Sequence, residues 1–227
     1  MFNDKYGLTQ AVLSGRKTMT RRIIPPIEIE WARRGKVTLP VSAYRHGTLW
    51  MDCRQFLPDS GLFDYAAPQK YQPLYDIGEE VAIAQTYKDA QWKPDTLQQV
   101  WVKEPTIFPA LDPITSYCGW VDLPLKCHEG WNNKMFVMAG LMPHAIRITR
   151  IEATRLQYIS DKDCLREGVE KWMNCYIVAG IMEHGGKNNA TFNTPQQAFA
   201  ALINRISGKG TWESNPWTYI YEFELVR

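Results

Sequence analysis

Residues 217–226 alternate between two kinds of side chain, a pattern with a period of two that predicts a β-strand. One side of the extended chain carries Trp217, Tyr219, Tyr221, Phe223 and Leu225, and the other carries Thr218, Ile220, Glu222, Glu224 and Val226. Because Ile220 and Val226 make the second side partly apolar, we expect this strand to lie in the interior of a sheet, antiparallel to at least one neighbour.

The other predicted strands are not interleaved regularly with helices. We expect strands over Val81–Ala84, Lys134–Met138 and Ala145–Ile151, a short helix over Thr9–Leu13, and longer helices that begin at the capping residues Ser160 and Thr194. This order disfavours a doubly wound, Rossmann-like fold, which is the main alternative. It predicts an α+β fold in which helices flank a small, mostly antiparallel β-barrel.

Length and composition fit one folded domain. The chain has 227 residues, of which 45% are hydrophobic and 22% are charged, which excludes a disordered chain and a coiled coil. No apolar run approaches the roughly 20 residues of a membrane span, so we expect a cytoplasmic protein without a membrane partner. We predict a single domain over residues 1–227, with two loop-rich insertions at about 25–74 and 88–133. The first insertion contains strand-like pieces at Lys36–Leu39 and Thr48–Met51.

Cysteine and histidine spacing gives no sign of a metal site. The five cysteines include no C-x-x-C pair, and the four histidines have no metal-binding or triad spacing. We therefore expect free thiols in a reducing compartment, no structural metal and no cofactor.

The N-terminal part of the chain is basic and contains a dense motif. Residues 1–50 carry a net charge of +6, and the rest of the chain carries −4. This asymmetry indicates either an anionic partner or a solvated basic face. Within the run G-R-K-T-M-T-R-R that starts at Gly15, Lys17, Thr20 and Arg22 can converge on one pocket. A Lys–Thr pair can act as base and nucleophile if burial and like charge lower the lysine pKa; the alternative is a basic turn.

The same residues resemble the signature of ASCH domains, a branch of the PUA-like β-barrels. The pattern Gly15-x-Lys17-x-x-Thr20-x-Arg22 departs from the usual G-x-K-x-x-E-x-R only at Thr20. The resemblance continues in Tyr75–Val81, in Ile146–Gly168, and in the N-P-W and aromatic strand of Asn215–Phe223, which is typical of phage and prophage members. It covers roughly a third to a half of the chain and implies a PUA-like (ASCH) barrel.

The threonine departure implies a chemistry. ASCH amidohydrolases that remove an acetyl group from the exocyclic amine of acetylcytidine also have threonine at this position. By that resemblance Lys17 is the base, Thr20 the nucleophile and Glu167 the acid. Glu167 precedes Gly168 at a predicted helix C-terminus, where the helix dipole and burial both favour a protonated carboxyl that can donate to a leaving amine. Otherwise Glu167 is an exposed helix-end carboxylate.

A second function class is a non-catalytic reader of RNA or modified nucleic acid. In that hypothesis the pocket holds a base, and Lys17, Arg21 and Arg22 contact phosphate, with Arg22 facing the pocket and Arg21 at its rim. Asn215 can read a base edge and Trp217 can stack on the base. The alternative for Asn215 and Trp217 is an Asn-Pro turn that starts the last strand with a packed indole.

Overall fold

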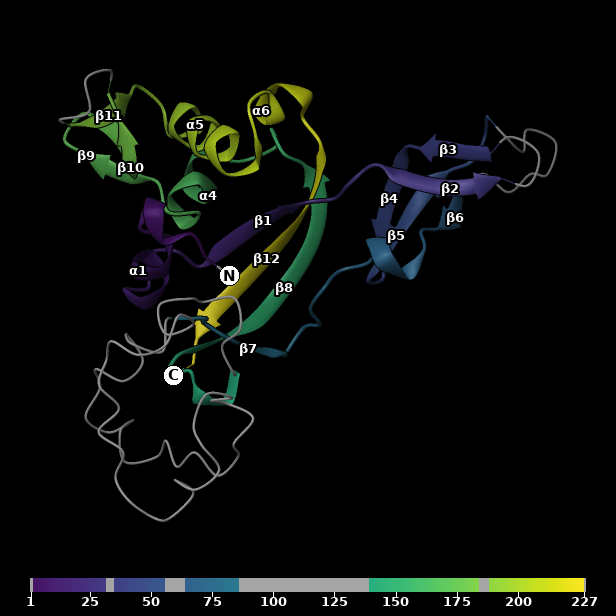
Figure 1. Ribbon diagram of the computed structural model, residues 1–227, viewed down its shortest axis with the longest axis horizontal. Helices are drawn as coiled ribbons and strands as arrows, with labels where there is room; N and C mark the ends of the chain where they lie inside the picture. The colour runs from purple at the N-terminus through teal and green to yellow at the C-terminus, as the bar shows by residue number, and fades with distance from the viewer. Residues whose placement is uncertain (1, 32–34, 56–63, 86–138, 184–187, 227) are drawn as a thin grey trace, which may run out of the picture. The chain divides into compact units, whose positions relative to one another are not determined.

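The computed structural model describes residues 2–31, 35–55, 64–85, 139–183 and 188–226 (Figure 1). In these ranges the protein is mixed α and β, with mostly antiparallel strands and few helices. The chain divides into two compact units, one formed by residues 2–80 and 146–226 and the other by residues 81–145. The predicted strand Lys134–Met138 and the predicted insertion at 88–133 lie outside the described residues.

A curled, half-barrel sheet organises the larger unit. Its strands are β1 (Met19–Ile23), β12 (Trp217–Leu225), β8 (Ala145–Arg155) and β7 (Glu80–Ala82), in the order β1-β12-β8-β7. Figure 1 shows β1, β12 and β8 side by side. Strand β12 is antiparallel to both β1 and β8, which confirms the central position predicted for it. The predicted strands at Val81 and Ala145 correspond to β7 and β8.

Burial explains why β12 occupies the centre. Its consecutive residues Thr218, Tyr219, Ile220 and Tyr221 are all buried, so both faces of the strand are covered. An edge strand, or a strand with one face in solvent, would leave alternate residues exposed. The partly apolar second side that the sequence shows at Ile220 therefore reflects a strand packed on both faces.

Helices pack beside this sheet with a second, smaller sheet. They are η1 (Asp4–Tyr6), α1 (Leu8–Leu13), α4 (Asp161–Arg166), α5 (Pro195–Ser207) and α6 (Thr211–Ser214), and the smaller sheet holds β9 (Glu170–Trp172), β10 (Cys175–Met182) and β11 (Asn189–Phe192). Both predicted caps form: the Ser160 hydroxyl accepts from Asp163 N, and the Thr194 hydroxyl accepts from Gln197 N. Phe199 and Leu202 of α5 lie in one buried cluster with Val178 of β10 and Cys164 of α4.

The first predicted insertion contains more strand than the sequence indicated. Residues 25–74 form β2 (Ile27–Trp31), β3 (Gly35–Leu39), β4 (Val41–Arg45), β5 (Thr48–Asp52), β6 (Asp64–Ala66) and the turn η2 (Gln69–Tyr71). They make a two-stranded sheet, β2-β3, and a three-stranded sheet, β4-β5-β6. Pro40 and Pro68 lie outside these strands, where a missing N–H breaks no ladder.

The unit formed by residues 81–145 is described at its two ends. The backbone N–H of Ile83 donates to the carbonyl of His144 at 2.8 Å, and η4 (Ala139–Leu141) precedes the buried Met142. The hydrogen bond between Ile83 and His144 joins the start of this unit to its end.

Candidate functional site

The basic motif occupies the connection from α1 to β1. Gly15 follows the helix with φ +74°, a conformation that glycine adopts without strain. The Lys17 N–H then donates to the carbonyl of Ala11, and the Thr18 N–H donates to the carbonyl of Arg166. The motif is therefore fixed by α1 on one side and by the end of α4 on the other.

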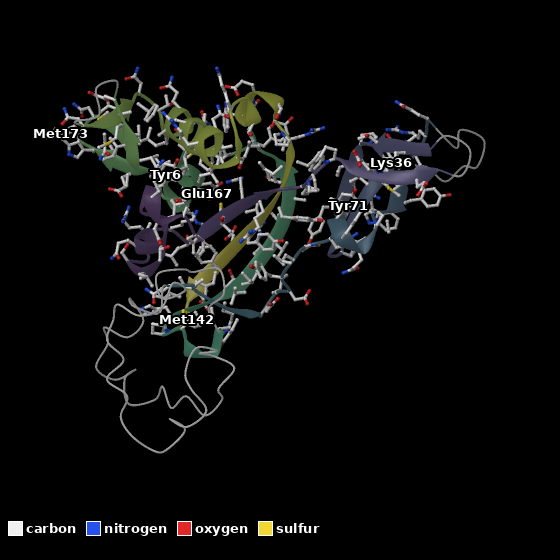
Figure 2. The ribbon with its side chains drawn as sticks, in the orientation of Figure 1. Tyr6, Lys36, Tyr71, Met142, Glu167 and Met173 are labelled. Carbon is white, nitrogen blue, oxygen red and sulfur yellow. The ribbon has the colours of Figure 1, made fainter. Side chains whose placement is uncertain are left out.

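Lys17 and Glu167 form a buried pair. The exposed fraction is 2% for the Lys17 side chain and 5% for the Glu167 side chain. Lys17 Nζ donates to Glu167 Oε2 and also to the Glu167 backbone carbonyl, at 2.7 Å in both cases. Glu167 is the C-cap of α4, and Figure 2 labels it beside that helix. The structure thus brings together two of the three residues for which the sequence suggested a catalytic role.

Arg21 adds a second cation to this pair. Its guanidinium NH1 lies 3.6 Å from Glu167 Oε1, and its side chain is 1% exposed. Glu167 Oε1 and Arg21 Nε are buried, and neither has a hydrogen-bond partner in the described part of the chain. Two basic side chains therefore surround one carboxylate, and one oxygen of that carboxylate is left for a further donor.

This environment lowers the pKa of Lys17. Burial is the largest cause, because it removes the water that would solvate the ammonium form. The Glu167 carboxylate opposes the shift, and the nearby charge of Arg21 reinforces it. A lysine with a lowered pKa loses its proton more readily and can act as a base.

Thr20 and Arg22 lie on the other face of β1. Side chains alternate along a strand, so Thr20 and Arg22 point away from the face on which Arg21 meets Glu167. Among the described residues Thr20 makes no hydrogen bond to Lys17, whose amine is bonded to Glu167. The prediction that Arg22 faces the Lys17 site and Arg21 its rim was wrong, because strand alternation gives Arg21 the buried contact with Glu167.

Arg166 holds the two halves of the site together. Its Nε donates to Thr18 Oγ1 at 3.0 Å, and its NH2 donates to Glu222 Oε2 at 2.8 Å. Arg166 precedes Glu167 and Thr18 follows Lys17, so these bonds clamp the backbone on both sides of the buried pair. Sequence reasoning missed Arg166, because its partners lie 148 and 56 positions away and no local pattern marks them.

Asn215 and Trp217 have structural contacts. The Asn215 side-chain oxygen accepts from the Gln157 N–H at 2.9 Å, and the residue ends α6 with φ +44°. The guanidinium of Arg155 lies 5.2 Å from the Trp217 ring. These contacts fit the turn-and-strand alternative. Both residues also lie beyond the Ile23 end of β1, whereas Lys17 precedes its Met19 end.

No group of three or more His, Cys, Asp or Glu side chains in the described ranges could hold a metal ion, and no helix there is long and apolar enough to cross a membrane. Cys53, Cys164 and Cys175 are free thiols, while Cys118 and Cys127 lie outside the described residues. The chain matches no family model, no curated protein and no solved structure. Its function must therefore be argued from its own residues.

Proposed function

We propose that this chain is a PUA-like ASCH protein that hydrolyses the amide between an acyl group and the exocyclic amine of a nucleobase or nucleoside. The observation that carries the proposal is the buried Lys17, whose pKa is lowered and whose amine contacts Glu167 at 2.7 Å. The signature Gly15-x-Lys17-x-x-Thr20-x-Arg22 and the curled antiparallel sheet support the ASCH assignment.

Amide hydrolysis needs one group to take a proton and another to give one. A base must remove the proton of the attacking hydroxyl, and an acid must protonate the leaving amine. The nitrogen of Lys17 has two of its bond directions occupied by the contacts with Glu167. In the neutral amine the remaining direction holds the nitrogen lone pair. Lys17 can therefore take the proton of the nucleophile.

Glu167 completes the transfer. A proton taken by Lys17 can pass along the 2.7 Å contact to the Glu167 carboxylate, and from there to the leaving nitrogen. The carbon–nitrogen bond breaks, the base leaves with its free amine, and the acyl group remains on the nucleophile. Arg21 at 3.6 Å stabilises the carboxylate form that results.

Thr20 is the nucleophile in this proposal, as the resemblance implies. No described group forms a hydrogen bond with its hydroxyl, and its side chain is only partly buried. Strand β1 stands at the edge of its sheet and pairs only with β12 among the described strands. A substrate at this free edge can reach the Thr20 hydroxyl, and in this proposal one bridging water carries the proton of that hydroxyl to the buried Lys17 amine. Water then hydrolyses the acyl-threonine ester and frees the enzyme.

The reader function receives less support from the same geometry. Lys17 and Arg21 are buried against Glu167, and Arg16 pairs with Glu170 at 2.6 Å. Two of the three basic side chains expected to contact phosphate, Lys17 and Arg21, are therefore already paired with an acid.

The test is hydrolysis of acylated nucleosides. Purified protein is incubated with acetylcytidine and with other acylated cytidines and adenosines, and loss of the acyl group is followed by chromatography. We expect turnover by the wild type and a loss of about a hundredfold or more in Lys17→Met and Glu167→Gln. Lys36→Met removes an exposed lysine on β3 and should leave the rate unchanged.

Variants of Thr20 test its role separately. Thr20→Ala should abolish turnover, whereas Thr20→Ser keeps a hydroxyl and should retain part of it. Full activity in Lys17→Met with an intact fold by circular dichroism would contradict the mechanism. Absence of turnover, together with nucleic-acid binding that weakens steeply with salt, would favour the reader instead.

A further inference from the structure

The Thr20 face of β1 lies against buried tyrosines. In the antiparallel register Thr20 is opposite Tyr221, and Arg22 is opposite Tyr219. Residues that are directly opposite in such a pair have side chains on the same face. Tyr221 is 1% exposed and Tyr219 is 5% exposed, and their rings are 6.1 Å apart. A hydroxyl and a guanidinium therefore project beside a packed aromatic surface.

The segment 71–79 crosses this surface and adds a third ring. The Tyr219 hydroxyl donates to the carbonyl of Tyr71, which Figure 2 labels, and the Leu74 N–H donates to the Tyr221 hydroxyl, at 2.9 Å in both cases. The ring of Tyr75 packs edge-on against Tyr221, with centroids 5.6 Å apart. Two tyrosine hydroxyls thus anchor the segment and place Tyr75 next to β1.

Arg22 has no counter-ion among the residues that the structure describes. Its guanidinium carbon lies 5.8 Å from the centroid of the Tyr75 ring, and its side chain is partly buried. No carboxylate of the described residues lies within ion-pair distance of it, and its buried Nε has no acceptor. By contrast, Arg21 and Arg166 each face an acid. A partly buried cation without a partner is costly, and an arginine fork fits a phosphate through two parallel hydrogen bonds.

We propose that Arg22 binds the phosphate of a nucleotide whose base packs against Tyr75, so that the substrate is a nucleotide rather than a free nucleoside. This inference rests on the proposed hydrolysis and defines its substrate. Thr20 and Arg22 are two residues apart on one face, which separates them by roughly 7 Å. One ligand can therefore span both residues, with its phosphate at Arg22 and its acylated base near the Thr20 hydroxyl.

The inference is tested by binding, which needs no turnover. Titration calorimetry compares cytidine 5′-monophosphate with cytidine on the wild type. We expect the monophosphate to bind about tenfold more tightly or better, because hydrogen bonds to a charged group are worth at least that factor. Arg22→Ala should bind both ligands equally, and Arg22→Lys should restore part of the preference because it keeps the charge without the fork.

Arg155→Ala is the matched control. Arg155 also lies over an aromatic ring, that of Trp217, but it belongs to β8, on the opposite side of β12 from β1, so its loss should leave the preference intact. Equal affinity of the wild type for the two ligands, or an unchanged preference in Arg22→Ala, would overturn the inference. A short cytidine-containing RNA is the second probe: if it binds more tightly than the monophosphate and depends equally on Arg22, the phosphate comes from a nucleic-acid chain.

The outcomes separate this inference from the proposed function. If the protein hydrolyses acylated nucleosides but does not prefer a phosphorylated ligand, only the role of Arg22 is contradicted, and the amidohydrolase proposal stands. If the protein prefers the monophosphate through Arg22 but hydrolyses no acylated substrate, only the proposed hydrolysis is contradicted. Lys17→Met, which should lose turnover, provides a form in which binding of acylated nucleotides can be measured without hydrolysis.

Discussion

Removing Glu167 should destabilise the protein more than removing Lys17, although the two side chains bond to each other. Glu167→Gln takes away the acid that faces both Lys17 and Arg21, and the Arg21 side chain is 1% exposed. Lys17→Met leaves the contact between Arg21 and Glu167 in place, which is a balanced pair. Glu167 is the one acid that the described residues place in this cluster, so the cluster should tolerate loss of Lys17 better than loss of Glu167.

The expected magnitudes differ by about 2 kcal/mol. A buried charge that loses its partner costs about 3–5 kcal/mol, and Glu167→Gln leaves Arg21 in that condition. Lys17→Met leaves the carbonyl of Glu167 without the donor that now lies at 2.7 Å, which costs about 1–3 kcal/mol. In Lys17→Met a buried apolar side chain replaces a buried amine, which is costly to remove from water. This replacement offsets part of the loss in the free energy of unfolding.

Urea unfolding at pH 7, followed by tryptophan fluorescence, measures both variants. Glu170→Gln is the matched control, since Glu170 also pairs with an arginine, at 2.6 Å, but both side chains are about 40% exposed. An exposed pair of this kind contributes at most about 1 kcal/mol. The reasoning fails if Lys17→Met is as destabilising as Glu167→Gln, or if Glu167→Gln costs no more than the control.

Three further predictions follow from burial and backbone geometry. Burial lowers the pKa of Lys17, so between that pKa and about 10.4 the unfolded chain binds more protons than the folded protein. The free energy of unfolding should therefore rise with pH over this range in the wild type but not in Lys17→Met. Burial raises the pKa of Cys164 to about 12, so iodoacetamide at pH 8 should modify the half-buried Cys175 before Cys164, as followed by peptide mapping with mass spectrometry. Modification of Cys164 as early as Cys175 would show that Cys164 is open to solvent. A Cβ at Gly180 would overlap a backbone oxygen of η1, so Gly180→Ala should cost about 3 kcal/mol or more in urea unfolding. Gly47→Ala, with a similar positive φ but open space, should cost about 1–2 kcal/mol, and equal costs would rule out the overlap.

The elements that the sequence predicted well are those whose signals are local. The alternation in residues 217–226 located β12 and its central position, and Ser160 and Thr194 marked the starts of α4 and α5 because their hydroxyls bond to N–H groups three residues away. The strands of residues 25–74 were mostly missed. They are short, and prolines dominate the local signal between them.

Only those site residues that belong to a recognised sequence motif could be predicted. Lys17 and Glu167 came from the resemblance and meet in the structure. The clamp of Arg166 with Thr18 and Glu222 depends on α4 packing against β1 and β12, a tertiary arrangement that no sequence spacing encodes. The roles of Arg21 and Arg22 were interchanged, because the motif fixes which residues matter without fixing the register at which the strand begins.

The spacing of Lys17 and Thr20 explains how one motif serves two faces. An interval of three residues cannot place both side chains on one face of a regular strand, because side chains alternate with a period of two. The structure starts β1 at Met19, with Lys17 directed to Glu167 and Thr20 on the face of Tyr221. The two groups share only the strand itself, whose outer edge is unpaired among the described strands. The proposed reaction therefore needs the scissile amide at that edge, with its carbonyl carbon at the Thr20 hydroxyl and one bridging water between that hydroxyl and the Lys17 amine.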